Sequence, residues 1–500
     1  SYRGPSGINK DRAMNLPKRS YDESMIGTIA VSTSPDANVG IQRQLTLDPA
    51  ITSTRGYIKP QDHDTIEEET NVNLMCPAEL LSPPGALHDD SHRTSMSYKQ
   101  SKYMVLTADS CPVLVGNKVE EVVPYYMGKE FCVTAKKKGK VIDQVDNLYI
   151  IEYVDGTREA FSTDAREQKN SAGGFYIETK FVTDLKVGDT FKEGQVLAWN
   201  DRAFTKNANG ITASMNIGVL TKIAVLPNFD EYEDSAPITA SLARRLATTI
   251  VNEEAIVVSK DAFIQSMVKV GDKVEVGDVL IAYDNVKDDA EYTTMLSDLL
   301  TQFGEDLIGN SVIRKTAEYS GEITNIKFYS ASDLSDLSDS LRPLVNDYWK
   351  KLKRKESTLN KYANPDDPAT YKCGELITEV PGKTETKFGK ILGHQVDDGV
   401  LIRIFIKHSD LVKKGDKVTN YTALKGIVSN VIEEGYEPFS ELRPSEEIST
   451  MIAPSAILAR KTPSVFLSEW GNKIMIELKR KMIETYFGEG YIEKNDIKIY

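Results

Sequence analysis

The stretch that decides the fold class is Val270-Gly271-Asp272-Lys273-Val274-Glu275-Val276-Gly277-Asp278-Val279-Leu280, in which short apolar pieces alternate with Gly-Asp pairs. A similar pattern runs from Leu185 to Leu197, and a partial copy from Val412 to Val418. Each copy predicts a strand, a glycine turn and a second strand. The pattern is typical of barrel-sandwich hybrid folds and also of biotinyl or lipoyl carriers. A carrier needs a modifiable lysine next to a methionine at its hairpin tip, and no such pair lies between these strands, which disfavours the carrier.

The composition predicts a multidomain globular protein. The 500 residues are too many for one hydrophobic core. The sequence contains no run of about 18 apolar residues, so no membrane helix is predicted. The four cysteines are scattered without a CxxC spacing, so we expect neither a zinc site nor a disulfide framework.

The charge pattern leaves two interpretations open. The net charge of -13 disfavours a general nucleic-acid binder. Cations nevertheless outnumber acids in residues 403–425 and again in residues 460–481, as on a protein with one side facing a polyanion. Composition alone favours the simpler interpretation, in which these are solvated surface lysines.

Several segments show clear periodicity. Residues 148–154 predict a strand that ends at an Asp-Gly hairpin signal. Helical spacing of apolar residues appears in residues 292–308, 341–359 and 465–486. The second of these helices carries five cations between Lys350 and Lys355.

Familiar catalytic motifs are missing from the sequence. It contains no P-loop, no GxGxxG after a strand, no GxSxG and no HExxH. The five histidines show no metal-binding spacing, and no Asp-rich triad of the kind that holds magnesium in polymerases occurs. The motifs therefore predict a protein that is not an enzyme by itself.

Six strings, in the same order, resemble segments of the β subunit of multi-subunit DNA-dependent RNA polymerases. The family patterns are GPGGLTRERA, ETPEGPNIGL, HDDANRALM, YNFEDS, LLRAIFGE and GDKMAGRHGNKGVIS. The corresponding strings here are residues 4–13, 33–41, 88–96, 229–235, 299–305 and 415–429. The last string departs from the family, because Asn420-Tyr421-Thr422-Ala423 stands where the family has Gly-Arg-His-Gly.

The resemblance implies a mixed α/β, multidomain, β-rich fold with a double-psi-barrel core, a barrel-sandwich hybrid and a flap excursion. It also implies a division into six domains. They are an active-site-facing segment near the fork loop (1–110), the first part of the barrel core (111–250), the flap (251–330), a helical insertion (331–395), the second part of the core (396–440) and a C-terminal helical segment (441–500).

The resemblance implies a phosphate-binding site built from lysines and arginines, the side chains that suit triphosphate oxygens. Lys417 and Lys425 would contact the RNA 3′ end and its scissile-side phosphate, and the eight-residue spacing lets both face one phosphate. Arg93 and Arg460 would reach the triphosphate of the incoming nucleotide. The simpler alternatives are that Lys417 is an exposed turn residue and that Arg93 pairs with a neighbouring acid.

Further residues receive roles from the same resemblance. Glu233 and Asp234 would lie near a nucleotide-borne second magnesium ion or position a neighbouring arginine, unless they belong to an acidic surface loop. Lys102 would lie near the same site. Five residues would face nucleic acid: Arg3, Lys10, Arg12, Asp36 and Asn38.

The helix expected at residues 292–308 corresponds to the flap tip. Its apolar stripe would be exposed unless a partner covers it, and the family receives a σ factor there. We therefore expect a promoter-specificity or σ-like factor on Met295, Leu299, Leu300 and Phe303.

The resemblance also implies partners and a setting. The catalytic Mg2+ would be held mainly by a β′-like subunit that carries an Asp triad, and this chain would hold no metal alone. A separate N-terminal β half, DNA template, RNA and nucleoside triphosphates complete the expected assembly, without a membrane. A split and diverged β subunit is similar to those of giant bacteriophages, which predicts a cytoplasmic location in a bacterial host. The alternative is a polymerase-derived scaffold or regulator without catalysis, but such a scaffold has no need of phosphate ligands.

Overall fold

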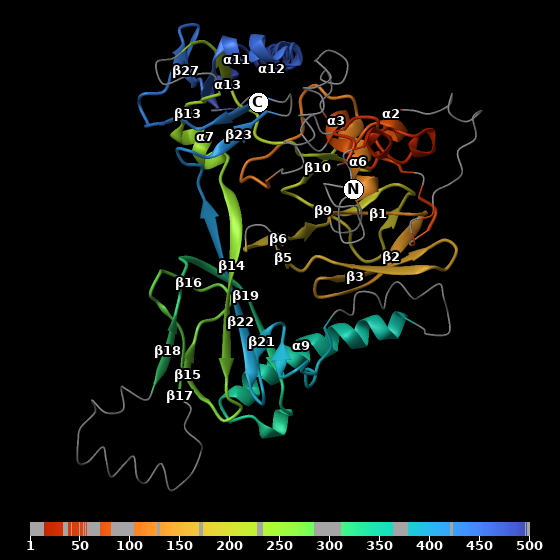
Figure 1. Cartoon of the computed structure of the whole chain (residues 1–500), viewed down its shortest axis with the longest axis vertical. Helices are drawn as coiled ribbons and strands as arrows, with labels where there is room; N and C mark the ends of the chain where they lie inside the picture. Colours follow the sequence, from red (N-terminus) through yellow and green to blue (C-terminus); the bar gives the residue numbers. More distant parts are fainter. Residues whose placement is uncertain are drawn as a thin grey trace. The chain divides into compact units, whose positions relative to one another are not determined.

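The computed structural model divides the chain into two units, and each unit is built from separate stretches of sequence (Figure 1). Unit 1 comprises Ser1–Thr134, Trp199–Thr248 and Leu411–Tyr500, and unit 2 comprises Ala135–Ala198 and Thr249–Asp410. The structure describes residues 15–33, 39–41, 43–49, 51–53, 55, 57, 71–81, 105–127, 131–169, 174–227, 234–284, 312–363, 379–420, 424–495 and 497.

Unit 1 combines short strands with most of the helices. Its helices are α1 (Leu16–Arg19), α2 (Asn71–Leu74), α3 (Pro77–Leu80), α6 (Val119–Met127), α7 (Ala240–Arg245), α11 (Pro454–Arg460), α12 (Ser464–Phe487) and α13 (Tyr491–Lys494). Its strands are β1 (Cys132–Thr134), β10 (Phe204–Lys206), β11 (Ala213–Met215), β12 (Ile223–Val225), β13 (Ile238–Thr239), β23 (Lys417–Thr419), β24 (Lys425–Ile427), β25 (Val431–Ile432), β26 (Phe439–Ser440), β27 (Arg443–Glu447) and β28 (Thr450–Ile452).

Unit 2 is mainly β structure with one long helix, α9 (Leu341–Tyr362). Its first strands are β2 (Gly139–Val145), β3 (Leu148–Tyr153), β4 (Arg158–Ser162), β5 (Arg166–Lys169), β6 (Tyr176–Thr179), β7 (Phe181–Val182), β8 (Thr190–Phe191), β9 (Val196–Asn200) and β14 (Thr248–Val258). The later ones are β15 (Phe263–Met267), β16 (Lys273–Val274), β17 (Val279–Asp284), β18 (Ile313–Thr316), β19 (Gly321–Ser330), β20 (Lys390–Ile391), β21 (His394–Gln395) and β22 (Val400–Asp410).

The core of unit 2 is a six-stranded sheet with the order β16-β19-β22-β14-β6-β5. Its central strand β22 begins with a nearly continuous apolar run, and Val400, Leu401 and Ile402 are all fully buried, as expected for a strand covered on both faces. The helix α9 packs its N-terminal half, through Leu341 and Val345, into the core cluster of this sheet.

The other end of α9 packs against a second sheet of unit 2, with the order β4-β3-β2-β8. Leu359 is fully buried there with Leu148 and Ile150 of β3. One face of α9 is therefore fixed along its length, and the residues of the opposite face are exposed.

Most sequence-based elements in the described part are confirmed. The helices predicted at 341–359 and 465–486 are α9 and α12, and the strand predicted at 148–154 is β3. The helix predicted at 292–308 lies outside the described residues. The chain is a β-rich, multi-sheet, mixed α/β protein, as predicted. The double-psi barrel, the barrel-sandwich hybrid and the six domains stay predictions. Among the described residues, no helix is long and apolar enough to span a membrane.

The Gly-Asp segments form the same turn in both units. In each, the backbone N–H of the aspartate donates to the carbonyl oxygen three residues earlier, and the glycine has a positive φ, which is the arrangement of a type II turn. The aspartate Oδ2 then accepts from the backbone N–H of that earlier residue. The N–O distances are 2.8 Å for Lys186 and Asp189, 2.7 Å for Lys269 and Asp272, and 2.8 Å for Lys413 and Asp416.

Each turn is also tied to one residue of a facing strand by two backbone bonds. Gly415 N–H donates to the Val428 carbonyl, and Val428 N–H donates to the Asp416 carbonyl, both at 2.8 Å. Gly271 and Asp272 exchange the same two bonds with Ile323, at 2.7 and 2.8 Å. This closed pattern fixes the register of the strand pair that follows the turn. A fourth turn, at Gly277-Asp278, makes the same bonds with Ala317.

Candidate phosphate-binding site

The lysine pair predicted from the sequence lies on the two-stranded ribbon of β23 and β24. The strands are antiparallel, with Thr419 opposite Lys425 and Lys417 opposite Ile427. Residues two apart on a strand share a face, and directly opposed residues share a face too. Lys417 and Lys425 are therefore diagonal neighbours on one face, a spacing of roughly 7–8 Å with the Cβ atoms somewhat closer.

Both lysines of this ribbon are exposed. Neither forms an ion pair with another residue in the part of the chain that the structure describes. Two like charges at this spacing repel each other unless an anion lies between them. The face therefore favours binding of a multiply charged anion such as a phosphate.

The ribbon is supported from its side by the segment around Asp234. The Asp234 carbonyl accepts a 2.8 Å bond from Ile427 N–H, and Ala236 N–H donates a 2.9 Å bond to the Ile427 carbonyl. This approach requires a glycine in β24, because a Cβ on Gly426 would lie 2.9 Å from the Asp234 carbonyl oxygen. The next residues of this segment enter the core, where Ile238 packs with Val428.

Arg460 reaches the same place from the last position of α11. The helix begins with Pro454 and ends where Lys461 adopts a left-handed conformation with φ +52°. Ile457 anchors the helix against Leu424, next to the lysine of β24. A cation at a helix C-terminus is favoured by the helix dipole. The Arg460 guanidinium donates to Asp234 Oδ1 in an ion pair.

Four of the residues singled out in the sequence, Lys417, Lys425, Asp234 and Arg460, are thus linked by strand pairing, backbone hydrogen bonds and one ion pair. Asp234 links them, since its carbonyl holds β24 and its carboxylate holds Arg460. The ion pair occupies one nitrogen of Arg460, and a guanidinium has five N–H donors, so donors remain for an anion. Sequence analysis offered, as one alternative for Glu233 and Asp234, that they position a neighbouring arginine, but it did not identify that arginine as Arg460.

The other predicted site residues lie outside the described residues. They are Arg93, Lys102 and Glu233 of the nucleotide site, Arg3, Lys10, Arg12, Asp36 and Asn38 of the nucleic-acid-facing set, and Met295, Leu299, Leu300 and Phe303 of the flap tip.

The first of the two basic stretches, residues 403–425, is divided between the two units. Arg403 and Lys407 belong to the sheet of unit 2, whereas the later cations belong to unit 1. Arg403 pairs with Glu253, and Lys407 Nζ lies 2.6 Å from Glu178 Oε2. Burial opposes the charged form of Arg403, but the bond and charge of Glu253 outweigh it and raise the pKa of Arg403. These two cations are neutralised within the protein.

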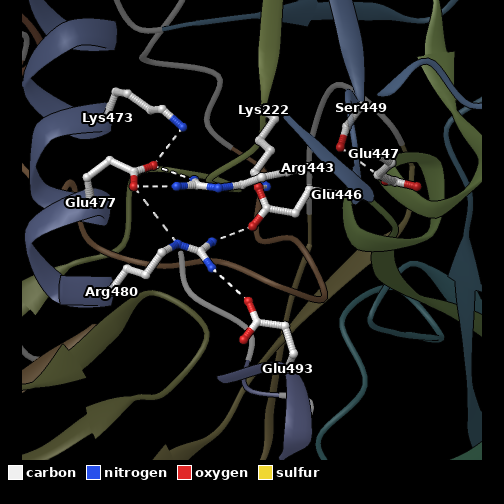
Figure 2. A network of polar contacts seen from close by, with 9 residues as sticks. All are labelled: Lys222, Arg443, Glu446, Glu447, Ser449, Lys473, Glu477, Arg480 and Glu493. Carbon is white, nitrogen blue, oxygen red and sulfur yellow. Dashed lines mark hydrogen bonds and ion pairs between the residues drawn. The ribbon is translucent and has the colours of Figure 1, made fainter. Parts of the chain in front are cut away.

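The second basic stretch, residues 460–481, contributes Lys473 and Arg480 to a network of ion pairs (Figure 2). Arg443 binds Glu477 through both terminal nitrogens, at 2.5 and 2.6 Å, and Lys473 joins the same carboxylate at 2.8 Å. The bonds from Arg443 outweigh burial and hold the pKa of Glu477 at about 2. Arg480 pairs with Glu446, which also binds Lys222. Glu446, the partner of Arg480, lies outside a window of sequence around α12, so this pairing was missed.

The described residues do not fit a magnesium site. They include no group of three or more His, Cys, Asp or Glu side chains that lie together as metal ligands. Asp234 supplies one carboxylate, and that carboxylate already binds Arg460. Magnesium is held by converging oxygen ligands, and the described residues do not supply such a set.

Comparison with known proteins gives a consistent set of distant relatives. No family model matches the chain. It is 23% identical over 516 residues to DNA-directed RNA polymerase subunit beta of Orientia tsutsugamushi (strain Boryong), over 84% of this chain and 36% of that protein. It is 22% identical over 535 residues to the same subunit of Anaeromyxobacter sp. (strain Fw109-5), over 87% of this chain and 36% of that protein.

A third relative, DNA-directed RNA polymerase subunit beta of Corynebacterium diphtheriae (strain ATCC 700971 / NCTC 13129 / Biotype gravis), is 25% identical over 306 residues, or 55% of this chain and 25% of that protein. The chain therefore spans about a third or less of the length of these relatives. It is a distant homologue of the β subunit of DNA-directed RNA polymerase.

Proposed function

We propose that this chain is a β-type subunit of a multi-subunit DNA-dependent RNA polymerase, and that Lys417 and Lys425 bind phosphate at its nucleotidyl-transfer site. The observation that carries the proposal is the shared, uncompensated lysine face of β23 and β24 in a chain homologous to that subunit. The chain would contribute to a composite site and be inactive alone.

The chemistry of nucleotidyl transfer explains why such a face is useful. Negative charge is spread over the phosphoryl oxygens in the transition state, so catalysis depends on positioning and on charge stabilisation. Lysine is a compact point charge with three donors. In the free subunit both lysines are solvated. A partner subunit that covers them would lower the local dielectric and strengthen their attraction for phosphate.

Arg460 would bind the triphosphate of the incoming nucleotide while Asp234 holds the guanidinium in place. Asp234 is then a positioning residue, which acts through Arg460 and through its carbonyl bond to β24. Arg93 and Lys102 are proposed for the same triphosphate, and Glu233 for the vicinity of a nucleotide-borne magnesium ion. Arg3, Lys10, Arg12, Asp36 and Asn38 are proposed to face nucleic acid.

Magnesium chemistry would come from a partner. A metal ion in this reaction activates the attacking hydroxyl and stabilises the leaving oxygens. We propose that a β′-like subunit supplies the carboxylate triad and that a separate chain supplies the N-terminal part of β. The flap tip would receive a promoter-specificity factor, and the low identity to bacterial β subunits suits a giant-bacteriophage origin.

The decisive experiment is primer extension by the complex and by the single chain. The purified chain with template, primer, nucleotides and Mg2+ should yield no product, whereas the complex purified through this chain should extend the primer. Lys417→Ala with Lys425→Ala should lower the extension rate about 100-fold or more while the complex stays assembled, because two phosphate contacts of about 1.5–3 kcal/mol each are removed.

The control is Lys269→Ala with Lys273→Ala, which removes two exposed lysines from the equivalent turn in unit 2, where Lys273 corresponds to Lys417 and Lys269 to Lys413. It should leave the rate unchanged. Extension by the single chain would exclude a composite site. Full activity of the Lys417 and Lys425 variant in an assembled complex would favour the alternative, a polymerase-derived scaffold or regulator.

A further inference from the structure

The helix α9 carries a cationic face that the proposed active site does not use. Its exposed positions from the middle of the helix to its end contain no acid and no aromatic residue. These positions are Lys350, Lys351, Lys353, Arg354, Ser357, Asn360 and Lys361.

The buried side of the same helix fixes the direction of this face. Leu341, Val345 and Leu359 are fully buried in unit 2. At 100° per residue these three lie within a narrow stripe, and the cations from Lys353 round to Lys351 cover an arc of about 160° on the opposite side. The cationic face is therefore held outward by packing over the whole length of α9.

Three of these cations have no counter-ion among the residues that the structure describes. Lys350 pairs with Asp347 at 3.2 Å, and Lys361 lies 3.6 Å from Asp143. Lys351, Lys353 and Arg354 form no ion pair with any residue that the structure describes. The helix dipole accounts for cations in the last turn, but these three lie in the middle of the helix, where its effect has faded.

We propose that this face of α9 binds the phosphate backbone of double-stranded DNA without reading its sequence. From Lys350 to Lys361 the face extends about 16 Å along a rigid helix, and duplex DNA carries one charge per roughly 1.7 Å of its axis. Single strands are bound mainly through aromatic platforms, which this face lacks. Asn360 is the sole exposed amide among these positions, so the face offers little for reading bases.

The net charge of the whole chain restricts where DNA could bind. A protein with a net charge of -13 has no general attraction for DNA, so binding must come from a local cationic face. The face belongs to unit 2 and shares no residue with the candidate phosphate site of unit 1. A test of DNA binding by α9 is therefore separate from a test of the phosphate site, and either result can be negative without affecting the other.

The test measures binding of the full chain to a 30-base-pair DNA duplex over a range of salt concentrations. Each lost phosphate contact lowers the magnitude of the log–log salt slope by about 0.9. Lys351→Gln with Lys353→Gln and Arg354→Gln should therefore lower it by two to three units and weaken binding at low salt by about tenfold or more.

The control is Lys186→Gln with Lys192→Gln and Lys269→Gln, which removes three exposed cations from turns of the same unit and changes the net charge equally. It should keep the slope. Lys351→Arg with Lys353→Arg should also keep it, which excludes a loss through misfolding. Equal loss in the two triple variants, or no loss in either, overturns the proposal. The proposal is also overturned if the α9 triple variant keeps DNA binding but loses binding to polyglutamate or to single-stranded RNA. The face would then belong to that polymer.

Discussion

Two strand pairs in this protein begin with the same turn and differ in charge. In unit 2, Gly271-Asp272 leads into β16, where Lys273 lies opposite Glu322 and Val274 opposite Gly321. In unit 1, Gly415-Asp416 leads into β23, where Lys417 lies opposite Ile427 and Val418 opposite Gly426. The bonds that tie each turn to its facing strand are the same within 0.1 Å.

This comparison separates a structural device from a chemical one. The turn fixes register in both units, and the facing glycine admits a third carbonyl in both, from Lys407 in unit 2 and from Asp234 in unit 1. What differs is the residue opposite the lysine. A carboxylate lies opposite the lysine of unit 2, whereas an isoleucine lies opposite the lysine of unit 1 and leaves it available to an external anion.

Replacing the residue opposite Lys417 with the glutamate found opposite Lys273 should have the largest effect. Ile427→Glu places a carboxylate opposite Lys417, where phosphate oxygens are proposed to lie. Primer extension by the complex should fall about 100-fold, since lost attraction and added repulsion together cost about 2.7 kcal/mol. Ile427→Gln is the uncharged control and should change the rate little. An unchanged rate with Glu would remove Lys417 from the mechanism.

The facing glycines should matter for stability in both units. A Cβ on Gly321 would lie 2.3 Å from the Lys407 carbonyl oxygen, and a Cβ on Gly426 would lie 2.9 Å from that of Asp234. Because both obstacles are backbone atoms, Gly321→Ala should lower the free energy of unfolding by about 2 kcal/mol and Gly426→Ala by about 1 kcal/mol. Urea unfolding of the purified chain measures both. A larger loss at Gly426 than at Gly321 would contradict the geometry.

Removing Arg460 should affect nucleotide binding and spare assembly. Arg460→Ala deletes a cation proposed for the triphosphate and should raise KM for nucleotide about tenfold, or about 1.4 kcal/mol, with kcat less affected. Arg443→Ala is the control, because Arg443 is also held by a carboxylate but belongs to the network of Figure 2. It should lower stability and keep KM. An unchanged KM in an assembled Arg460 variant would exclude the triphosphate role.

The smallest effect should be the same in both units. Asp272→Ala and Asp416→Ala each remove one bond to a backbone N–H, at 2.7 and 2.8 Å. Each should lower the free energy of unfolding by about 1 kcal/mol. Thermal unfolding at equal salt gives the comparison. A much larger loss at one turn would mean that the two turns are not equivalent supports.

The sequence predicted what depends on neighbouring residues. Glycine next to aspartate predicted the turns, because a positive φ and a carboxylate close to backbone N–H groups are local requirements. Apolar periodicity predicted α9 and α12, since one stripe of each must be buried. Homologous strings predicted a relationship to polymerase β, and the comparisons agree at the level of distant homology.

The sequence could not predict which cations have counter-ions. Arg403 meets Glu253 across 150 residues, and Arg460 meets Asp234 across 226 residues. A charge count within a window includes neither partner. It therefore overestimated the basic surfaces around Arg403 and around α12, where the acids arrive from other strands and helices.

The two backbone hydrogen bonds between the Gly415-Asp416 turn and Val428 have a consequence for how this region can vary in sequence. The ribbon is clamped at its open end, so the alignment of Lys417 with Lys425 is set before the chain reaches the tip. At the other end, Asn420 is bonded to Leu424 by its backbone N–H and by its side-chain Oδ1. The clamp at Val428 does not involve Asn420-Tyr421-Thr422-Ala423, so the alignment of Lys417 with Lys425 can be kept in a sequence that lacks the Gly-Arg-His-Gly of the family it resembles.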